Sequence, residues 1–217
     1  MVIVVAGMIG LGKSSLAEIL GEHYNSDVFY EEVNNNPVLE LFYTASEQEK
    51  KEKRYSFLLQ LAFLNSRFKS IKRALYNDKN ILDRSIYEDE YFAHNLYKLG
   101  DISGLEFDIY KGLLYNMMEE LKELPKKNPD LLIYLKGSFE VVMSHINKRG
   151  RDFEVNDDLR DYYYSLWKDY DSWVENEYHA SQVLIIDMDK YDFVNNHRDR
   201  EEVLQIIDNK LDEMGLL

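Results

Sequence analysis

Short, continuous runs of apolar residues alternate along the chain with long segments of helical pattern. Continuous apolar runs are typical of strands that are covered on both faces, as in parallel sheets. The segments between them are too long for hairpins and suit helical crossovers. The pattern therefore predicts a doubly wound α/β fold, with a five-stranded parallel sheet flanked by helices on both faces. The predicted strands are residues 2–6, 28–30, 80–82, 131–135 and 183–186.

Three of the segments between the strands are expected to be helical. They are residues 47–77 before the third strand, residues 138–148 after the fourth, and the acidic, aromatic residues 158–179. Helices in these places suit the crossover connections that parallel strands require.

The first predicted strand runs into a glycine-rich stretch, and a helical pattern follows from Ser15. Strand, G-x-x-x-x-G-K-S and helix in this order form the context of a phosphate-binding P-loop. Backbone N–H groups of such a loop point at phosphate oxygens, Lys13 can reach the β- and γ-phosphates, and the Ser14 hydroxyl can hold Mg²⁺. We therefore expect ATP and Mg²⁺ to bind here. The stretch reads Gly7-Met8-Ile9-Gly10-Leu11-Gly12-Lys13-Ser14.

Composition narrows the possible partners. The 217 residues carry a net charge of −14, which argues against nucleic acid and anionic membranes because both attract a basic surface. The chain has no cysteine, which excludes disulfides and fits a reducing compartment. No apolar run reaches membrane-spanning length, and a strand begins at residue 2, so we expect no signal peptide. A cytoplasmic protein with a single domain over residues 1–217 is expected.

Charged residues follow the second and third predicted strands, at the sheet edge where ligands of open α/β folds bind. Glu31 or Glu32 can accept a proton from a substrate hydroxyl there, although a solvated acidic strand end would look the same. After the third strand, Asp83 can orient Mg²⁺ and Arg84 can clamp phosphate oxygens. An ordinary strand-end ion pair is the alternative for these two residues.

The second half of the chain contains one concentrated basic cluster, Lys148-Arg149-Gly150-Arg151. Its arginines can close over a triphosphate as part of a lid and neutralise charge on the transferring phosphoryl group. The alternative is a cationic helix end that compensates the helix dipole. The cluster alone does not decide between them.

Together these pieces resemble the deoxynucleoside kinase family, and most closely its bacterial deoxyadenosine/deoxyguanosine kinase branch. The matching stretches occur in family order over residues 7–154, whereas the C-terminal third matches only as helix plus a fifth strand. Their number and order make the resemblance specific. The stretches are Gly7 to Ser15, Glu31-Glu32-Val33 followed by Asn36-Pro37-Val38-Leu39-Glu40-Leu41-Phe42-Tyr43, Phe57-Leu58-Leu59-Gln60, Asp83-Arg84-Ser85-Ile86-Tyr87-Glu88-Asp89, and Lys148-Arg149-Gly150-Arg151-Asp152-Phe153-Glu154.

The resemblance implies a P-loop kinase that transfers a phosphoryl group from ATP, with Mg²⁺, to the 5′-hydroxyl of a deoxynucleoside. It implies that Glu31 is the base for the hydroxyl and that Arg84 bridges the 5′-oxygen and the phosphate, with Asp83 near Mg²⁺. Gln60 would hold the edge of the nucleobase.

Four further residues receive roles from the same resemblance. Tyr43 and Glu154 look like the pair that holds the 3′-hydroxyl of a deoxyribose. Arg149 and Arg151 look like arginines of a lid near residues 145–155.

Two residues bear on the choice of nucleobase. Arg67 lies seven residues after Gln60, so both project from one helix face, and Asp89 lies on the helix after the third strand. The family's purine and deoxycytidine enzymes have an Arg and an Asp at these positions, which its thymidine-preferring members lack. We favour deoxyadenosine, with deoxyguanosine and deoxycytidine as alternatives.

The chain departs from the family pattern at three places. His145 stands where many members have another lid arginine, and a histidine carries less charge at pH 7. Glu32 replaces the usual proline, which leaves the assignment of Glu31 open to a shift of one residue. Phe153 replaces a second acid that often precedes the residue matching Glu154.

Two other functions compete with this one. A thymidylate-kinase-like nucleotide kinase would need a cation for its phosphorylated acceptor near the second strand, where this chain has glutamates. A P-loop regulatory module usually carries an Asn-Lys-x-Asp element after a strand, and none follows the fourth or fifth strand. The family resemblance further suggests a homodimer, although ordinary core packing explains the helical amphipathicity equally well.

Overall fold

A computed structural model of the chain describes residues 1–33, 35–74, 79–121, 128–156 and 159–217. Its strands form one parallel sheet in the order β2-β3-β1-β4-β5. Each observed strand overlaps a predicted one, so the predicted five-stranded parallel sheet is confirmed. The strands are β1 (Val2–Gly7), β2 (Asp27–Phe29), β3 (Asn80–Asp83), β4 (Leu131–Lys136) and β5 (Gln182–Asp187).

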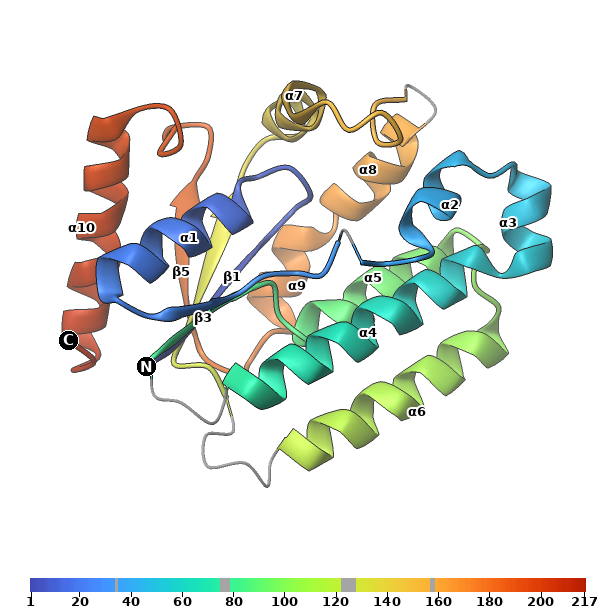
Figure 1. Cartoon of the computed structure of the whole chain (residues 1–217), viewed down its shortest axis with the longest axis horizontal. Coiled ribbons are helices and arrows are strands. Elements are labelled where there is room, and N and C mark those ends of the chain that lie inside the picture. Colours follow the sequence, from blue (N-terminus) through green and yellow to red (C-terminus); the bar gives the residue numbers. More distant parts are fainter. Residues whose placement is uncertain (34, 75–78, 122–127, 157–158) are drawn as a thin grey trace.

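Helices cover both faces of this sheet. They are α1 (Lys13–Tyr24), α2 (Leu39–Thr44), α3 (Glu47–Lys53), α4 (Tyr55–Ala74), α5 (Tyr87–Lys98), α6 (Gly104–Leu121), α7 (Phe139–Arg149), α8 (Arg160–Trp167), α9 (Tyr170–Asn176) and α10 (His197–Glu213). The chain moves from β1 toward β2 at one sheet edge and then back toward β4. Because crossovers between parallel strands are right-handed, the two directions place helices on opposite faces. Figure 1 shows α1 and α10 on one side and α4, α5 and α6 on the other. None of the described helices is long and apolar enough to cross a membrane.

The single helix predicted over residues 47–77 is broken, and the segment predicted to be helical over residues 158–179 holds two helices. The helix expected over residues 47–77 is two helices, because Arg54 has a left-handed backbone (φ 59°) that ends α3. Residues 75–77 lie outside the described part of the chain. The Arg54 side chain pairs with Glu106 of α6, a tertiary contact that helical periodicity cannot reveal.

The segment expected to be helical over residues 158–179 divides into α8 and α9. Residue 158 lies outside the described residues. Trp167, the last residue of α8, donates from Nε1 to the Gly137 carbonyl at 2.9 Å. This bond fixes the end of α8 near the carboxyl end of β4.

The parallel register brings the carboxyl ends of the strands to one edge of the sheet. Val5 of β1 pairs with Asp83 of β3, and Gly7 pairs with Leu135 of β4. The chain leaves β1 and β3 in opposite directions across the sheet. A ligand crevice is expected at such a switch point. All six residues of β1 are buried, so the loop that follows starts from a rigid base.

Candidate active site

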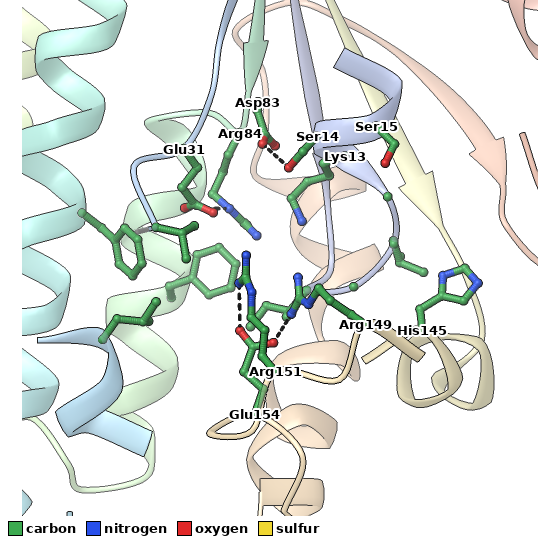
Figure 2. A pocket seen from close by; sticks show the side chains of 18 of the residues that line it. Lys13, Ser14, Ser15, Glu31, Asp83, Arg84, His145, Arg149, Arg151 and Glu154 are labelled. Carbon is green, nitrogen blue, oxygen red and sulfur yellow. Dashed lines mark hydrogen bonds and ion pairs between the residues drawn. The ribbon is translucent and has the colours of Figure 1, made fainter. Parts of the chain in front are cut away.

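A cavity of about 480 Å³ opens at this edge of the sheet (Figure 2). Its size is that of a typical small-molecule site. It brings together nearly all residues that the sequence predicted to bind or react, while Gly7 and Met8 are absent from its described lining. The predicted residues that line it are Ile9 to Ser15, Glu31, Tyr43, Gln60, Arg67, Asp83, Arg84, Asp89, Arg149, Arg151 and Glu154.

The P-loop forms one end of the cavity. Gly12 has φ 85°, which a residue with a side chain rarely adopts, and it precedes the first turn of α1. A Cβ at Gly7 would lie 2.8 Å from the Leu135 carbonyl oxygen, so the strand end needs glycine to pass β4. Met8 contributes its carbonyl, which accepts from Lys13 Nζ at 2.9 Å. The loop thus holds the lysine before any phosphate arrives.

The surroundings of Lys13 favour the binding of an anion. Burial and the nearby Arg84 lower the pKa of Lys13 to about 7, and the carboxylates of Asp83 and Glu31 oppose this shift only in part. A buried cation of this kind is favoured by a negatively charged ligand. The N-terminus of α1, which directly follows, also favours phosphate.

Ser14 and Asp83 form the candidate magnesium site. The Ser14 hydroxyl donates to Asp83 Oδ2 at 2.5 Å. The other carboxylate oxygen, Oδ1, is buried without a hydrogen-bond partner among the described residues. Burial raises the pKa of Asp83, as expected for a carboxylate that lacks a full set of partners. Because Mg²⁺ prefers oxygen ligands, an unpartnered carboxylate oxygen beside a hydroxyl fits this ion.

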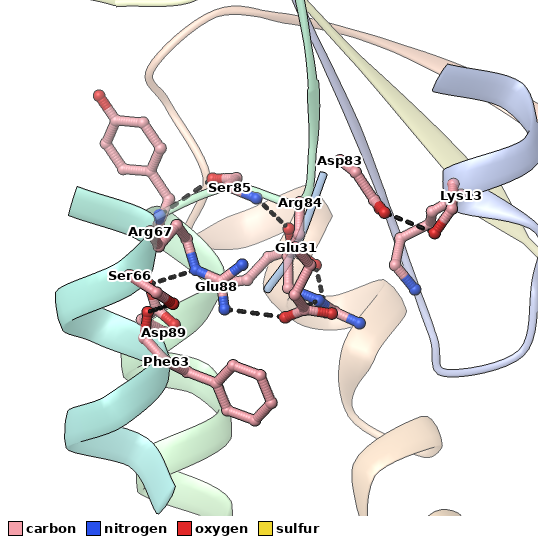
Figure 3. Close-up of polar contacts among 12 residues, drawn as sticks. Lys13, Glu31, Phe63, Ser66, Arg67, Asp83, Arg84, Ser85, Glu88 and Asp89 are labelled. Carbon is pink, nitrogen blue, oxygen red and sulfur yellow. Dashed lines mark hydrogen bonds and ion pairs between the residues drawn. The ribbon is translucent and has the colours of Figure 1, made fainter. Parts of the chain in front are cut away.

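Glu31 lines the cavity between two arginines (Figure 3). Its Oε1 is 3.1 Å from Arg67 Nη2 and 3.2 Å from Arg84 Nε. Burial alone would raise the pKa of Glu31, but Arg84 and Arg67 outweigh it and lower the pKa to about 2. The carboxylate is therefore ionised at neutral pH. Of the two described glutamates, Glu31 lines the cavity and Glu32 does not.

Arg67 also joins Glu31 to Asp89. Arg67 Nε donates to Asp89 Oδ2 at 2.7 Å, and the Asp89 side chain is only 1% exposed. Burial raises the pKa of Asp89 to about 6, against the opposing effect of Arg67. Gln60 is buried two helical turns earlier on α4 and lines the same cavity. Gln60, Arg67 and Asp89 therefore bring hydrogen-bond donors and acceptors to one wall of the cavity.

The two arginines predicted to form a lid are in direct contact with Glu154. Arg151 Nη1 lies 3.1 Å from Glu154 Oε1, and Arg149 Nη2 pairs with the other oxygen. Gly150, with φ 63°, ends α7 between the two arginines. His145 lines the cavity one helical turn before Arg149 (Figure 2). Tyr43 is close to Glu154. Burial raises the pKa of Tyr43 well above the usual range, so the Tyr43 hydroxyl keeps its proton.

Several lining residues were not predicted. Phe63 lies between Gln60 and Arg67 on one face of α4, and this helical spacing could have identified it. Phe92 follows Asp89 by three residues on α5 in the same way. The remaining unpredicted residues include Tyr162 of α8 and a group after β5, whose position at a strand end was a usable signal. That group is Met188, Asp192, Val194 and Asn195.

Comparison with known proteins identifies the family. A family model described as deoxynucleoside kinase matches residues 3–212. The chain belongs to the deoxynucleoside kinase family. A deoxyguanosine kinase and a deoxyadenosine kinase of Lactobacillus acidophilus are 48% and 46% identical to it, over 100% of this chain and 93% and 99% of their own lengths. A solved deoxyadenosine kinase from M. mycoides with bound dATP matches with a TM-score of 0.78 and 25% identity, covering 96% of this chain and 100% of that one.

Membership of the deoxynucleoside kinase family confirms the predicted resemblance, the P-loop kinase fold and the enzyme class. It favours a phosphotransferase that acts on nucleosides over the nucleotide kinase and the regulatory module. The match extends to residue 212, well beyond the stretches that carried the resemblance in the sequence.

Replacing Arg67 by Met should lower the free energy of unfolding by about 3–5 kcal/mol, because Glu31 and Asp89 then lose the cation they share. The double variant Arg67→Met/Asp89→Asn should be less destabilised than the single variant, since the charge of Asp89 is then gone and Glu31 keeps its contact with Arg84. Urea unfolding at pH 7.5 measures both values. A double variant as unstable as Arg67→Met would contradict the coupling inferred from the 2.7 Å contact.

Proposed function

We propose that the chain transfers the γ-phosphoryl group of ATP to the 5′-hydroxyl of a deoxynucleoside, with deoxyadenosine preferred and deoxyguanosine or deoxycytidine as alternatives. One observation carries the proposal: a single cavity joins the P-loop to the half-buried, ionised carboxylate of Glu31. The P-loop suits a triphosphate donor, and Glu31 suits a hydroxyl acceptor. The relatives named deoxyguanosine kinase and deoxyadenosine kinase support a purine acceptor.

In the proposed reaction, Glu31 accepts the proton of the 5′-hydroxyl while the oxygen attacks the γ-phosphorus in line. A bond forms between the 5′-oxygen and phosphorus, and the bond from phosphorus to the bridging oxygen breaks to release ADP. Arg84 and Lys13, both on the cavity wall, stabilise the charge of the phosphoryl group. Mg²⁺, when bound by Ser14 and Asp83, would supply further charge neutralisation.

The acceptor would be held at both ends. Tyr43 and Glu154 are proposed to hold the 3′-hydroxyl, with the protonated Tyr43 as a donor. Gln60, Arg67 and Asp89 are proposed to contact the nucleobase, because a Gln amide pairs with a base edge through a donor and an acceptor. The apolar side chains that line the cavity, among them Phe63 and Phe92, support this assignment, since the ring of a nucleobase packs well against aromatic side chains.

Arg149 and Arg151 are proposed to act as lid arginines over the phosphates, within a lid near residues 145–155. Their side chains are about one-third exposed, which leaves them room to move from Glu154 to a ligand. His145 would contribute less charge to this lid than an arginine. Single-domain organisation over residues 1–217 and a cytoplasmic location also stay predictions of the sequence.

A homodimer is proposed on the basis of an apolar stripe along α6. Leu105, Ile109 and Leu113 recur every four residues, so they share one helix face, and they are 73%, 48% and 41% exposed. Apolar side chains gathered on an outer helix face are typical of an interface.

Purified protein should phosphorylate deoxyadenosine with ATP and Mg²⁺, and should phosphorylate deoxyguanosine and deoxycytidine to a smaller extent. A panel of the four deoxynucleosides, compared by kcat/KM from ADP release and product chromatography, measures this preference. Deoxyadenosine monophosphate is the control acceptor, because a site with Glu31 in place of a cation should reject its phosphate. Transfer to the monophosphate but not to the nucleosides would overturn the proposed function.

Replacing Glu31 by Gln should lower kcat by about 10²–10⁴-fold, because the amide cannot accept the proton of the 5′-hydroxyl. Binding of ATP, measured by calorimetry, should persist. Glu32→Gln is the matched control and should stay within about twofold of wild type, because that residue does not line the described cavity. The reverse pattern would move the base by one position.

Replacing Ile109 by Asp should convert the dimer to a monomer in sedimentation velocity, because the substitution buries a charge in the proposed interface. Leu99→Asp is a matched control, since Leu99 is also 48% exposed but lies outside α6. Both variants behaving like wild type would contradict an interface built on this stripe.

A further inference from the structure

We propose that Glu88, supported by Tyr170, is a positioning residue that holds Arg84 in place and links it to the P-loop. The inference rests on the proposed role of Arg84 in phosphoryl transfer. Glu88 lies in the first turn of α5 and is completely buried. It is absent from the described lining of the cavity, so it acts through its neighbours rather than on a substrate.

Glu88 fixes both the side chain and the backbone next to it. Its Oε1 accepts from Arg84 Nη1 at 2.9 Å, and its Oε2 accepts from the Ser85 backbone N–H at 2.8 Å (Figure 3). Arg84 itself has φ 81°, a left-handed conformation that costs energy for a residue with a side chain. The two bonds stabilise this turn, which directs the guanidinium from β3 toward the cavity.

The carboxylate of Glu88 also competes with Glu31 for the same guanidinium. Arg84 presents Nε to Glu31 at 3.2 Å and Nη1 to Glu88. The Phe92 ring lies 4.6 Å from the guanidinium carbon and supports its face. Without Glu88, Arg84 would be free to rotate toward Glu31 as a bidentate pair. Such a pair would occupy the carboxylate oxygens that the substrate hydroxyl needs.

Tyr170 extends this arrangement to the donor end of the site. Its hydroxyl donates to Glu88 Oε1 and accepts from the Gly7 backbone N–H at 3.2 Å. The side chain is 1% exposed, and its ring stacks on Tyr134 with centroids 5.4 Å apart. One continuous set of buried hydrogen bonds therefore runs from the first glycine of the P-loop to Arg84. It keeps the phosphate loop and the bridging arginine in fixed relation.

Packing alone does not account for a buried glutamate. An apolar residue of similar volume usually fills such a position at no cost in stability. A carboxylate at this position is explained if it keeps the Arg84 guanidinium in one direction. Small displacements of a reacting group lower reaction rates by about 10²-fold.

Three substitutions test the inference, with deoxyadenosine as acceptor. Glu88→Gln should lower kcat by about 100-fold, because the amide turns a donor toward Arg84 or Ser85. Tyr170→Phe should lower kcat by about tenfold. The dissociation constants of ATP and deoxyadenosine, from calorimetry, should change by less than about threefold in both. Tyr91→Phe is the matched control: it removes another buried hydroxyl of this aromatic cluster, bonded to the Leu166 carbonyl, and should leave kcat unchanged.

A merely structural role predicts a different result. If Glu88→Gln and Tyr170→Phe lower the melting temperature but keep kcat within twofold of wild type well below it, the inference is overturned. If Glu88→Gln does not fold, Tyr170→Phe alone decides, because its effect on kcat is compared with that of Tyr91→Phe.

Arg84→Ala separates this inference from the proposed function. An Arg84→Ala enzyme with normal kcat would remove the role of Arg84 and the inference with it. An inactive Arg84→Ala enzyme together with a normal Glu88→Gln enzyme would overturn the inference alone. Adding Glu88→Gln to Arg84→Ala should lower kcat much less than Glu88→Gln alone does, because Glu88 is proposed to act mainly through this arginine.

Discussion

The site depends on keeping one carboxylate, that of Glu31, charged although its side chain is only 17% exposed. Arg67 and Arg84 make this possible by sharing its Oε1. Each arginine is itself nearly buried, and each is balanced by a second acid, Asp89 for Arg67 and Glu88 for Arg84. Removing any member leaves a buried charge without its partner, which is far more costly than an exposed one. The constraint fixes how α4, α5, the end of β3 and the loop after β2 must meet, because the five charged side chains come from these four places.

Short stretches of sequence were enough to predict the sheet and the P-loop end of the site. The P-loop is one continuous stretch, and its glycines and lysine have their roles through backbone geometry that neighbouring residues define. The shared carboxyl edge follows from the parallel strands that the apolar runs predict, whereas the strand order was not predicted and comes from the structure. Prediction failed where a single backbone angle decided the outcome. Arg54 is the clearest case, because its left-handed conformation ends α3, and nothing in the charged run from Glu47 to Arg54 marks that break.

The acceptor end depends on contacts between distant segments, which a sequence does not display. Glu31 and Glu32 are two adjacent glutamates, and only the path of the chain after β2 shows which of them lines the cavity. Glu88 looks like an ordinary acid in the first turn of a helix, where the dipole favours it. Its hydrogen bond with Tyr170, 82 residues away in the sequence, is a contact from which the positioning role of Glu88 is inferred. The lining residues after β5 were missed because the family resemblance had weakened there.

The pKa of Glu31, about 2, limits the kind of base it can be. A general base works best when its pKa is near the operating pH, so a carboxylate between two arginines attracts a proton weakly. Phosphoryl transfer tolerates a weak base, because its loose transition state builds little bond to the attacking oxygen before the leaving group departs. In the proposed reaction, one of the two arginines that weaken the base, Arg84, would also stabilise charge on the transferring group. Glu31 would therefore act in this reaction as a weak base that also has to orient the hydroxyl. The direction of its neighbour Arg84 would affect both tasks.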